Sequence, residues 1–175
     1  MTTAALIAAL TAVSAYLVIP IGVVPVTMQS GVVLVSGALL GSRWGALSQA
    51  VYVSMGLIGV PVFAGGQSGP GMVLSPTFGY LVGFIAAAFV TGWCLERRPS
   101  ITPLRLVLAM LAGLAALDTL GLLYLYVYLR FIAGLAASWG TVFKLGLIPF
   151  LPFDGIKIAL AVVLVTAILR RKGER

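Results

Sequence analysis

The sequence has few charged side chains and no histidine. Its 11 basic and 4 acidic residues make up 9% of 175 residues, whereas soluble domains carry about 25%. So few charges cannot cover a water-facing surface, which excludes a soluble globular protein. The lack of histidine excludes imidazole bases and imidazole metal ligands. Cys94 is the only cysteine, so no disulfide can form within the chain.

The sequence also lacks a phosphate-binding loop, because no Gly-Lys-Ser or Gly-Lys-Thr occurs. ATP-driven work would therefore need another chain. The net charge of +7 does not indicate nucleic-acid binding, since the basic residues stand in short clusters beside hydrophobic runs and form no basic face. We expect no catalytic site, no metal and no cofactor, and hence no enzyme.

Hydrophobic residues are abundant from end to end, at 61% of the chain, and the mean hydropathy is +1.16. A bilayer span needs about 20 mainly apolar residues. The sequence therefore predicts an all-α integral membrane protein, in which residues 1–175 form one compact domain of six transmembrane helices surrounded by lipid. The expected spans are 3–19, 28–40, 46–58, 77–95, 104–128 and 148–169. The second and third are short, so residues 59–76 are expected to complete the crossing as a partly buried loop.

Basic residues predict the orientation of the bundle. Arg130 and Lys144 fall in loops on one side, and eight of the eleven basic residues fall on the other side, which also holds both termini. By the positive-inside rule both termini are cytoplasmic. The eight residues are Arg43, Arg97, Arg98, Arg105, Arg170, Arg171, Lys172 and Arg175.

Small residues recur at intervals of four in three spans, which lets helices approach closely. In the first span they are Ala4, Ala8 and Ala12, and either internal packing or the docking of a partner explains them. For the other two sets internal packing is favoured. These sets are Gly37, Gly41 and Gly45, and Gly79, Gly83 and Ala87.

Three ionisable residues fall within predicted spans, where charge is costly and function is the first hypothesis. Asp154 and Lys157 lie three residues apart, on one face of the start of the last helix, whose N-terminus adds positive charge. This arrangement can hold a carboxylate and a polar ring together, an interpretation we favour over mutual neutralisation at a helix end. Asp118 lies in the middle of a span without a basic partner in sequence, and either a structural or a coupling role fits it.

The stretch 59–71 contains five glycines and no charge. Glycine permits close backbone approach and unusual dihedral angles. The backbone around Gly66 can therefore wrap a small ligand.

Five stretches, in order along nearly the whole chain, resemble the BioY family, the biotin-specific substrate-binding (S) components of energy-coupling factor (ECF) transporters. They are PVTMQ (25–29), GSRWG (41–45), GVPVFAGGQSGPG (59–71), SPTFGYLVGF (75–84) and PFLPFDGIK (149–157). The resemblance implies the ECF S-component fold in a bacterial or archaeal plasma membrane, and biotin held at the outer end. It also implies two partners, a transmembrane coupling protein that docks on Ala4, Ala8 and Ala12, and cytoplasmic ATPase subunits.

The resemblance implies roles for particular residues in biotin binding. In one orientation of the ligand Lys157 would face the carboxylate of biotin and Asp154 its ring N–H groups, with Gln67, Thr77 or Gln29 at the ureido carbonyl. The opposite orientation would exchange these roles. Phe63, Phe78, Tyr80 and Trp139 would supply walls. Phe78 and Phe153 replace smaller family residues and are expected to add bulk beside the pocket.

The leading hypothesis is thus high-affinity biotin binding for uptake by an ATP-driven module. The alternative is a small proton- or ion-coupled carrier in which Asp118 titrates. A membrane scaffold without a ligand is a third possibility.

Overall fold

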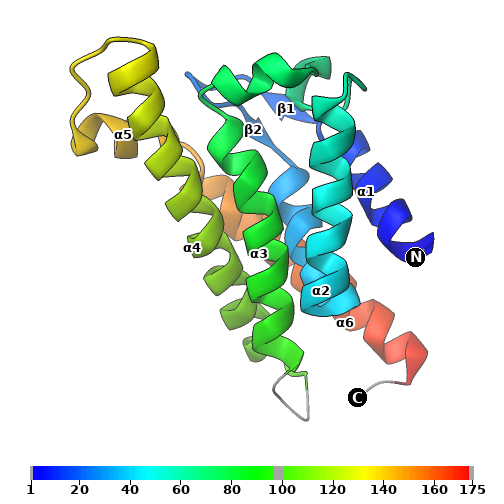
Figure 1. Cartoon of the computed structure of the whole chain (residues 1–175). Helices are drawn as coiled ribbons and strands as arrows, with labels where there is room; N and C mark the ends of the chain where they lie inside the picture. Colours follow the sequence, from blue (N-terminus) through cyan, green and yellow to red (C-terminus); the bar gives the residue numbers. More distant parts are fainter. Residues whose placement is uncertain (1, 97–100, 174–175) are drawn as a thin grey trace.

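The structure is a computed structural model that describes residues 2–96 and 101–173, and it is a bundle of helices (Figure 1). The helices are α1 (Thr2–Ser14), α2 (Gln29–Leu57), α3 (Phe78–Glu96), α4 (Pro103–Val127), α5 (Trp139–Gly146) and α6 (Leu151–Lys172). Strands β1 (Val18–Ile19) and β2 (Val26–Thr27) form an antiparallel pair. Two 3₁₀ turns, η1 (Ala64–Gly66) and η2 (Pro70–Leu74), follow α2, and a π turn, η3 (Tyr128–Ile132), extends α4.

Helix α2 is two helices joined by a sharp turn at Gly41. The backbone there has φ 78° and ψ 179°, a conformation open only to glycine. A Cβ atom on Gly45 would lie 2.9 Å from Gly37 Cα, so the two arms, residues 29–40 and 42–57, run back along each other. With α1, α3, α4 and α6 they make the six predicted helices.

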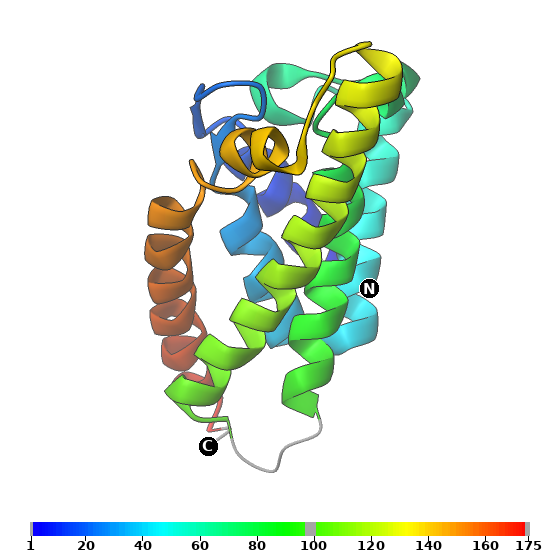
Figure 2. The ribbon, with the colours of Figure 1, turned by 90° about the vertical axis from the view of Figure 1, so that its left-hand side faces the viewer.

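Within residues 2–96 and 101–173, four helices are long and apolar enough to cross a membrane by length and composition, when α2 is counted as one. Helix α1 has 13 residues and is shorter than a full span. Figure 2 shows α5 beside α4 and α6 near the end of the bundle that carries the strands. We call this the loop end, and the turn at Gly41 lies at the opposite end of the bundle, where α3 ends at Glu96.

A carboxylate from α3 caps the second arm of α2. The Ser42 N–H donates to Glu96 Oε1 at 2.7 Å, and Ser42 Oγ donates to Glu96 Oε2 at 2.8 Å. A negative charge at a helix N-terminus satisfies a free N–H group and opposes the helix dipole favourably. Glu96 therefore fixes the turn at Gly41 against the end of α3.

The ends of several helices differ from the prediction. The first helix ends at Ser14 and not at Ile19, because the chain turns toward Pro20 and pairs β1 with β2. The last helix begins at Leu151, three residues late, with Pro152 in its first turn. The predicted connection 129–147 contains α5, which starts where Ser138 Oγ accepts from the Thr141 N–H at 3.3 Å.

The glycine sets serve internal packing, as predicted. A Cβ on Gly83 would lie 2.9 Å from the Leu117 carbonyl oxygen of α4, and one on Gly92 would meet the backbone of Ser42. These contacts hold α3 tightly between α4 and the turn of α2 (Figure 1).

The alanines of α1 pack internally in this structure, which is one of the two interpretations of their spacing, and their role in docking stays a prediction. Ala4 and Ala8 are only 6% and 1% exposed, on a helix that packs mainly against α2, and Ala12 is half-buried. In this structure the exposed large side chains of α1 are instead Leu6, Leu10 and Val13.

Helix α6 ends at the end of the bundle opposite the loop end, whereas the short helix α1 begins about halfway along the bundle (Figure 1). Arg97, Arg98 and Arg175 of the orientation argument lie outside the described residues. The cytoplasmic placement of the termini stays a prediction from the distribution of basic residues.

The turn at Gly41 generates a stability prediction. Gly41→Ala forces an L-residue into a strained conformation and sets its Cβ against the Glu96 carboxylate, at a cost of about 1–3 kcal/mol. The midpoint of thermal unfolding in detergent should fall by several degrees. Gly140→Ala in α5, where a Cβ meets nothing closer than 3.7 Å, is the control and should leave the midpoint unchanged or raise it. Equal midpoints in both variants would contradict the role of Gly41.

Candidate functional site

A cleft opens at the loop end, and about 670 Å³ of space lies within it and its open mouth together. The cleft is lined by residues of β2, α2, α3, α4 and α6 and of the segments that connect them. They are Val24, Pro25, Thr27, Gln29, Ser30, Phe63, Ala64, Gln67, Met72, Thr77, Tyr80, Leu81, Phe84, Leu114, Leu117, Asp118, Phe150, Asp154 and Lys157.

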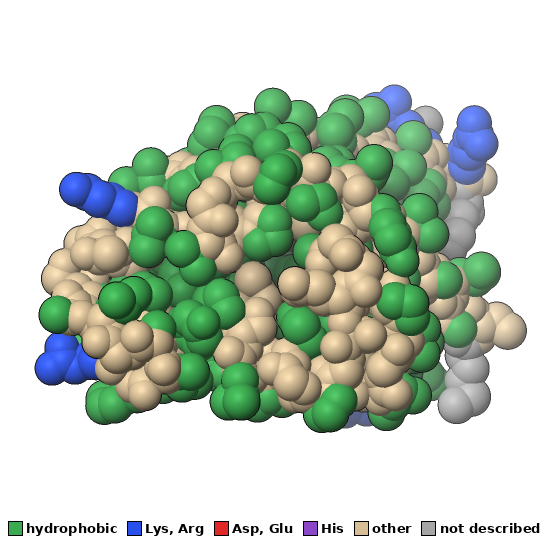
Figure 3. Space-filling view, turned by 90° about the horizontal axis from the view of Figure 1, so that it is seen from above, with side chains coloured by type: hydrophobic (Ala, Val, Ile, Leu, Met, Phe, Trp, Pro, Cys, Tyr) green, Lys and Arg blue, Asp and Glu red, His purple; other side chains and the backbone are tan. Residues whose placement is uncertain are grey.

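Seen from above, the loop end shows hydrophobic and uncharged polar groups with basic side chains at the rim and no acidic side chain (Figure 3). The acidic groups of the cleft are therefore covered.

An ion pair is buried in the wall of the cleft. Lys157 Nζ lies 3.0 Å from Asp154 Oδ1, one turn apart on α6, and each residue is 5% exposed. Lys157 Nζ also donates to Ser30 Oγ of α2 at 3.0 Å. An ammonium has three donors, and among the described residues these two contacts are its only hydrogen bonds. One donor of Lys157 remains for a ligand.

Gln29 is held rigidly at the start of α2. Its Oε1 accepts from Thr27 Oγ1 at 2.9 Å, and its Nε2 donates to Tyr52 Oη. Tyr52 Oη in turn donates to the Val62 carbonyl at 3.0 Å. This chain of contacts joins the strand pair, both arms of α2 and the segment between α2 and α3, which we call the glycine-rich loop. One amide hydrogen of Gln29 remains for a ligand.

Phe63 anchors the glycine-rich loop. Its side chain is 1% exposed, lies edge-on to Tyr52 at 5.6 Å, and covers Gly56, where any Cβ would strike the ring. The Gly69 N–H donates to the Gly56 carbonyl at 2.7 Å. Phe63 thus closes the loop over α2 and lines the cleft, as predicted, whereas Gly66 does not line it.

Tyr80, Thr77 and Gln67 also line the cleft, as expected. The Tyr80 hydroxyl donates to the Gly146 carbonyl at 2.7 Å, which ties α5 to α3, so its proton is already used. Thr77 Oγ1 shares a hydrogen bond of 2.8 Å with Ser75 Oγ. Gln67 is exposed near the mouth.

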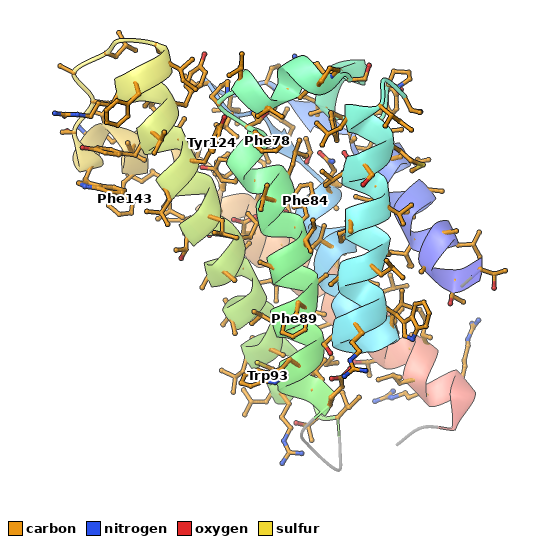
Figure 4. All side chains as sticks on the ribbon, in the orientation of Figure 1. Phe78, Phe84, Phe89, Trp93, Tyr124 and Phe143 are labelled. Carbon is orange, nitrogen blue, oxygen red and sulfur yellow. The ribbon has the colours of Figure 1, made fainter. Side chains whose placement is uncertain are left out.

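Three aromatic residues considered for the pocket lie outside its lining. Phe78 contacts Tyr124 edge-on at 5.6 Å between α3 and α4, where Figure 4 shows the two rings together. Trp139 stacks on Tyr126 at 4.4 Å. Phe153 lines an apolar groove beside β1 that shares Thr27 and Lys157 with the cleft. Phe153 therefore lies beside the cleft, as expected, whereas Phe78 packs away from it against α4.

Sequence reasoning missed Ser30 and left the position of Asp118 open, yet both line the cleft. Ser30 follows Gln29 at a helix start, and nothing in its local pattern marks it as a partner of Lys157. Asp118 carried a signal, a lone carboxylate within an apolar span. Its position on the cleft depends on the rotation of α4, which the packing of Gly83 against Leu117 sets.

Comparisons with known proteins agree with this arrangement. The sequence profile of the BioY family matches residues 1–174. The probable biotin transporter BioY of Lysinibacillus sphaericus is 44% identical over 82% of this chain and 73% of its own length. The biotin transporter BioY of Thermotoga maritima is 35% identical over 98% and 96%. The crystal structure of the S-component for biotin from an ECF-type ABC transporter superposes with a TM-score of 0.85 and 28% identity, covering 97% of this chain and 89% of that one.

The bundle and its cleft define a multi-pass, all-helical membrane protein with the fold of an ECF S-component. This confirms the predicted fold class. The chain belongs to the BioY family.

The loop anchor generates a second prediction. Phe63→Ala removes a fully buried ring, and large-to-small substitutions of this kind cost about 3–5 kcal/mol. Part of the glycine-rich loop should then detach, so that amides of residues 59–77 exchange hydrogen faster and proteases cut there first. Leu74→Ala, at an exposed residue of the same loop, is the matched control. If the loop of the Phe63→Ala variant is as well protected from hydrogen exchange and proteolysis as the loop of the Leu74→Ala variant, the anchoring role of Phe63 is wrong.

Proposed function

We propose that this protein is a high-affinity biotin-binding S component that mediates biotin uptake together with an ECF module. It is a transport component of bacterial or archaeal membranes and not an enzyme. The relatives that support this proposal are named as biotin transporters and come from bacteria and archaea. The observation that carries it is the buried pair of Asp154 and Lys157 in the wall of a mostly apolar cleft.

The chemistry of biotin fits the lining of this cleft. Biotin has two ring N–H donors, a ureido carbonyl, an apolar thioether ring and chain, and a carboxylate. Met72, Phe84, Leu114 and other apolar side chains offer a dry surface for the ring and chain. Lys157 has one donor for the carboxylate, and the Asp154 carboxylate accepts from a ring N–H.

The carbonyl of biotin has three candidate partners, Gln29, Gln67 and Thr77. Gln29 is supported best by its burial and by its contacts with Thr27 and Tyr52, which preset its amide before the ligand arrives. A rigid donor binds at a lower entropic cost than the exposed Gln67. We therefore place the carbonyl at Gln29, with Phe63 and Tyr80 as walls and the backbone near Gly66 above the mouth.

The proposed partners are a transmembrane coupling protein and cytoplasmic ATPase subunits. The similar solved structure is described as part of an ECF-type ABC transporter, and the present sequence contains no phosphate-binding loop. Since Ala4 and Ala8 are buried, a coupling protein that docks on α1 would meet Leu6, Leu10 and Val13 in this conformation.

An independent ion-coupled carrier is less well supported than the biotin-binding role. The family assignment covers residues 1–174, and Asp118 lines the same cleft as Asp154 and Lys157. Its carboxylate is thus accounted for at the ligand site, without a separate ion path.

Calorimetric titration of biotin into detergent-solubilised protein tests the proposal. Lys157→Met and Asp154→Asn should each weaken binding at least about 30-fold, the equivalent of about 2 kcal/mol for breaking a buried charged contact. Lys144→Met, at the loop end but outside the cleft, is the control and should bind like the unmodified protein. Unchanged affinity in both cleft variants would remove the proposed site, and no biotin binding by the unmodified protein would remove the function.

A further inference from the structure

Asp118 lies in the wall of the ligand cleft, on the face of α4 that also presents Leu114 and Leu117. These leucines are 9% and 4% exposed, and they stand four residues and one residue before Asp118. The part of the cleft wall that α4 forms is therefore apolar except for the Asp118 carboxyl. Asp118 lies within a membrane-spanning helix, where an ionised group is costly.

The Asp118 carboxyl has no partner within the described part of the chain. It takes part in no hydrogen bond and no ion pair there, in contrast to Asp154, which is paired with Lys157. Membrane proteins pair or neutralise such groups, because a lone charge in an apolar setting is destabilising. An unpaired carboxyl that faces a ligand cleft therefore points to a contact with the ligand.

The other titratable groups that line the cleft come from α6 and α3. Helix α6 contributes Asp154 and Lys157, which neutralise each other, and α3 contributes Tyr80, whose hydroxyl donates to the Gly146 carbonyl. The first arm of α2 contributes the uncharged Gln29 and Ser30, and α5 contributes no lining residue. Fully ionised, the cleft holds two carboxylates and one ammonium.

A ligand with a carboxylate worsens this balance. With Asp118 ionised, the filled cleft would hold two negative charges without a counter-charge, in a space from which the ligand displaces water. Like charges that share an apolar site favour protonation of one of them. Asp118 is the acid free to take the proton, because Asp154 is already stabilised by Lys157.

We infer that Asp118 is a further polar contact for the bound ligand and is protonated in the complex, so that the binding of biotin takes up a proton. The inference rests on the proposed function and adds a pH dependence to it. The protonated carboxyl donates a hydrogen bond to the ligand in the same cleft that the ion pair lines.

The sign of the pH dependence follows from proton uptake. Where free Asp118 is ionised, each binding event must bring a proton, so the affinity falls by up to tenfold per unit rise in pH. Where free Asp118 is already protonated, the affinity is constant. The ligand's own carboxyl is ionised above about pH 6 and contributes no slope there.

The test is calorimetric titration of biotin between about pH 6 and pH 8.5, in pairs of buffers that differ in ionisation enthalpy. The unmodified protein should take up close to one proton per biotin at the upper end and lose up to tenfold in affinity per pH unit. Asp118→Asn, which is neutral at every pH, should bind biotin without proton uptake and without a slope. The neutral amide of biotin should bind the unmodified protein with a smaller slope than biotin does.

The outcomes separate this inference from the proposed function. Biotin binding that is independent of pH, with no proton uptake, overturns the role of Asp118 and leaves the biotin site standing. A slope that persists in Asp118→Asn assigns the proton to another group and likewise overturns it. If the Asn variant does not fold, the two-buffer measurement on the unmodified protein can still overturn the role of Asp118, because that role requires proton uptake. Absence of biotin binding at every pH overturns the proposed function itself.

Discussion

The contact of Lys157 with Asp154 and Ser30 is the constraint on which the rest of the site depends. Helix α6 is the least buried of the long helices, with 28% of its apolar window inside the protein, so packing alone holds it loosely. The ammonium joins it to the start of α2 through Ser30 at 3.0 Å. A charge pair in an apolar setting tolerates little displacement, because either partner left alone is costly. The pair therefore positions α6 at the cleft.

The cover of the cleft is built around this fixed wall by side chains that reach backbone carbonyls. Tyr52 donates to Val62, Tyr16 to Pro61 and Tyr80 to Gly146. The first bond ties the glycine-rich loop to α2, the second ties it to the turn after α1, and the third ties α5 to α3. Phe63 adds an apolar anchor. The scaffold is thus held by helix contacts with little freedom, whereas its cover depends on a few individual contacts. Such segments are where local opening is least costly.

The sequence predicted the features that arise from composition and local rules. Hydropathy located the six helices, and the two ionisable residues Asp154 and Lys157 pointed to the wall of the cleft, because both signals stand out from an apolar background. The end of α1 was missed, since an apolar run such as residues 15–19 suits a strand as well as a helix. Ser30 and the orientation of Asp118 depend on how helices rotate against one another, which is set by contacts such as Gly83 with Leu117 and not by neighbours in sequence.

The sharp turn at Gly41 has a consequence for how the protein enters the membrane. Each arm of α2 is too short to cross the hydrocarbon core alone, and the Gly37–Gly45 contact leaves no room for lipid between them. The two arms must therefore partition into the bilayer as one preformed hairpin during synthesis. Since Glu96, which caps the turn, emerges from the ribosome much later, the hairpin has to persist uncapped until α3 is made.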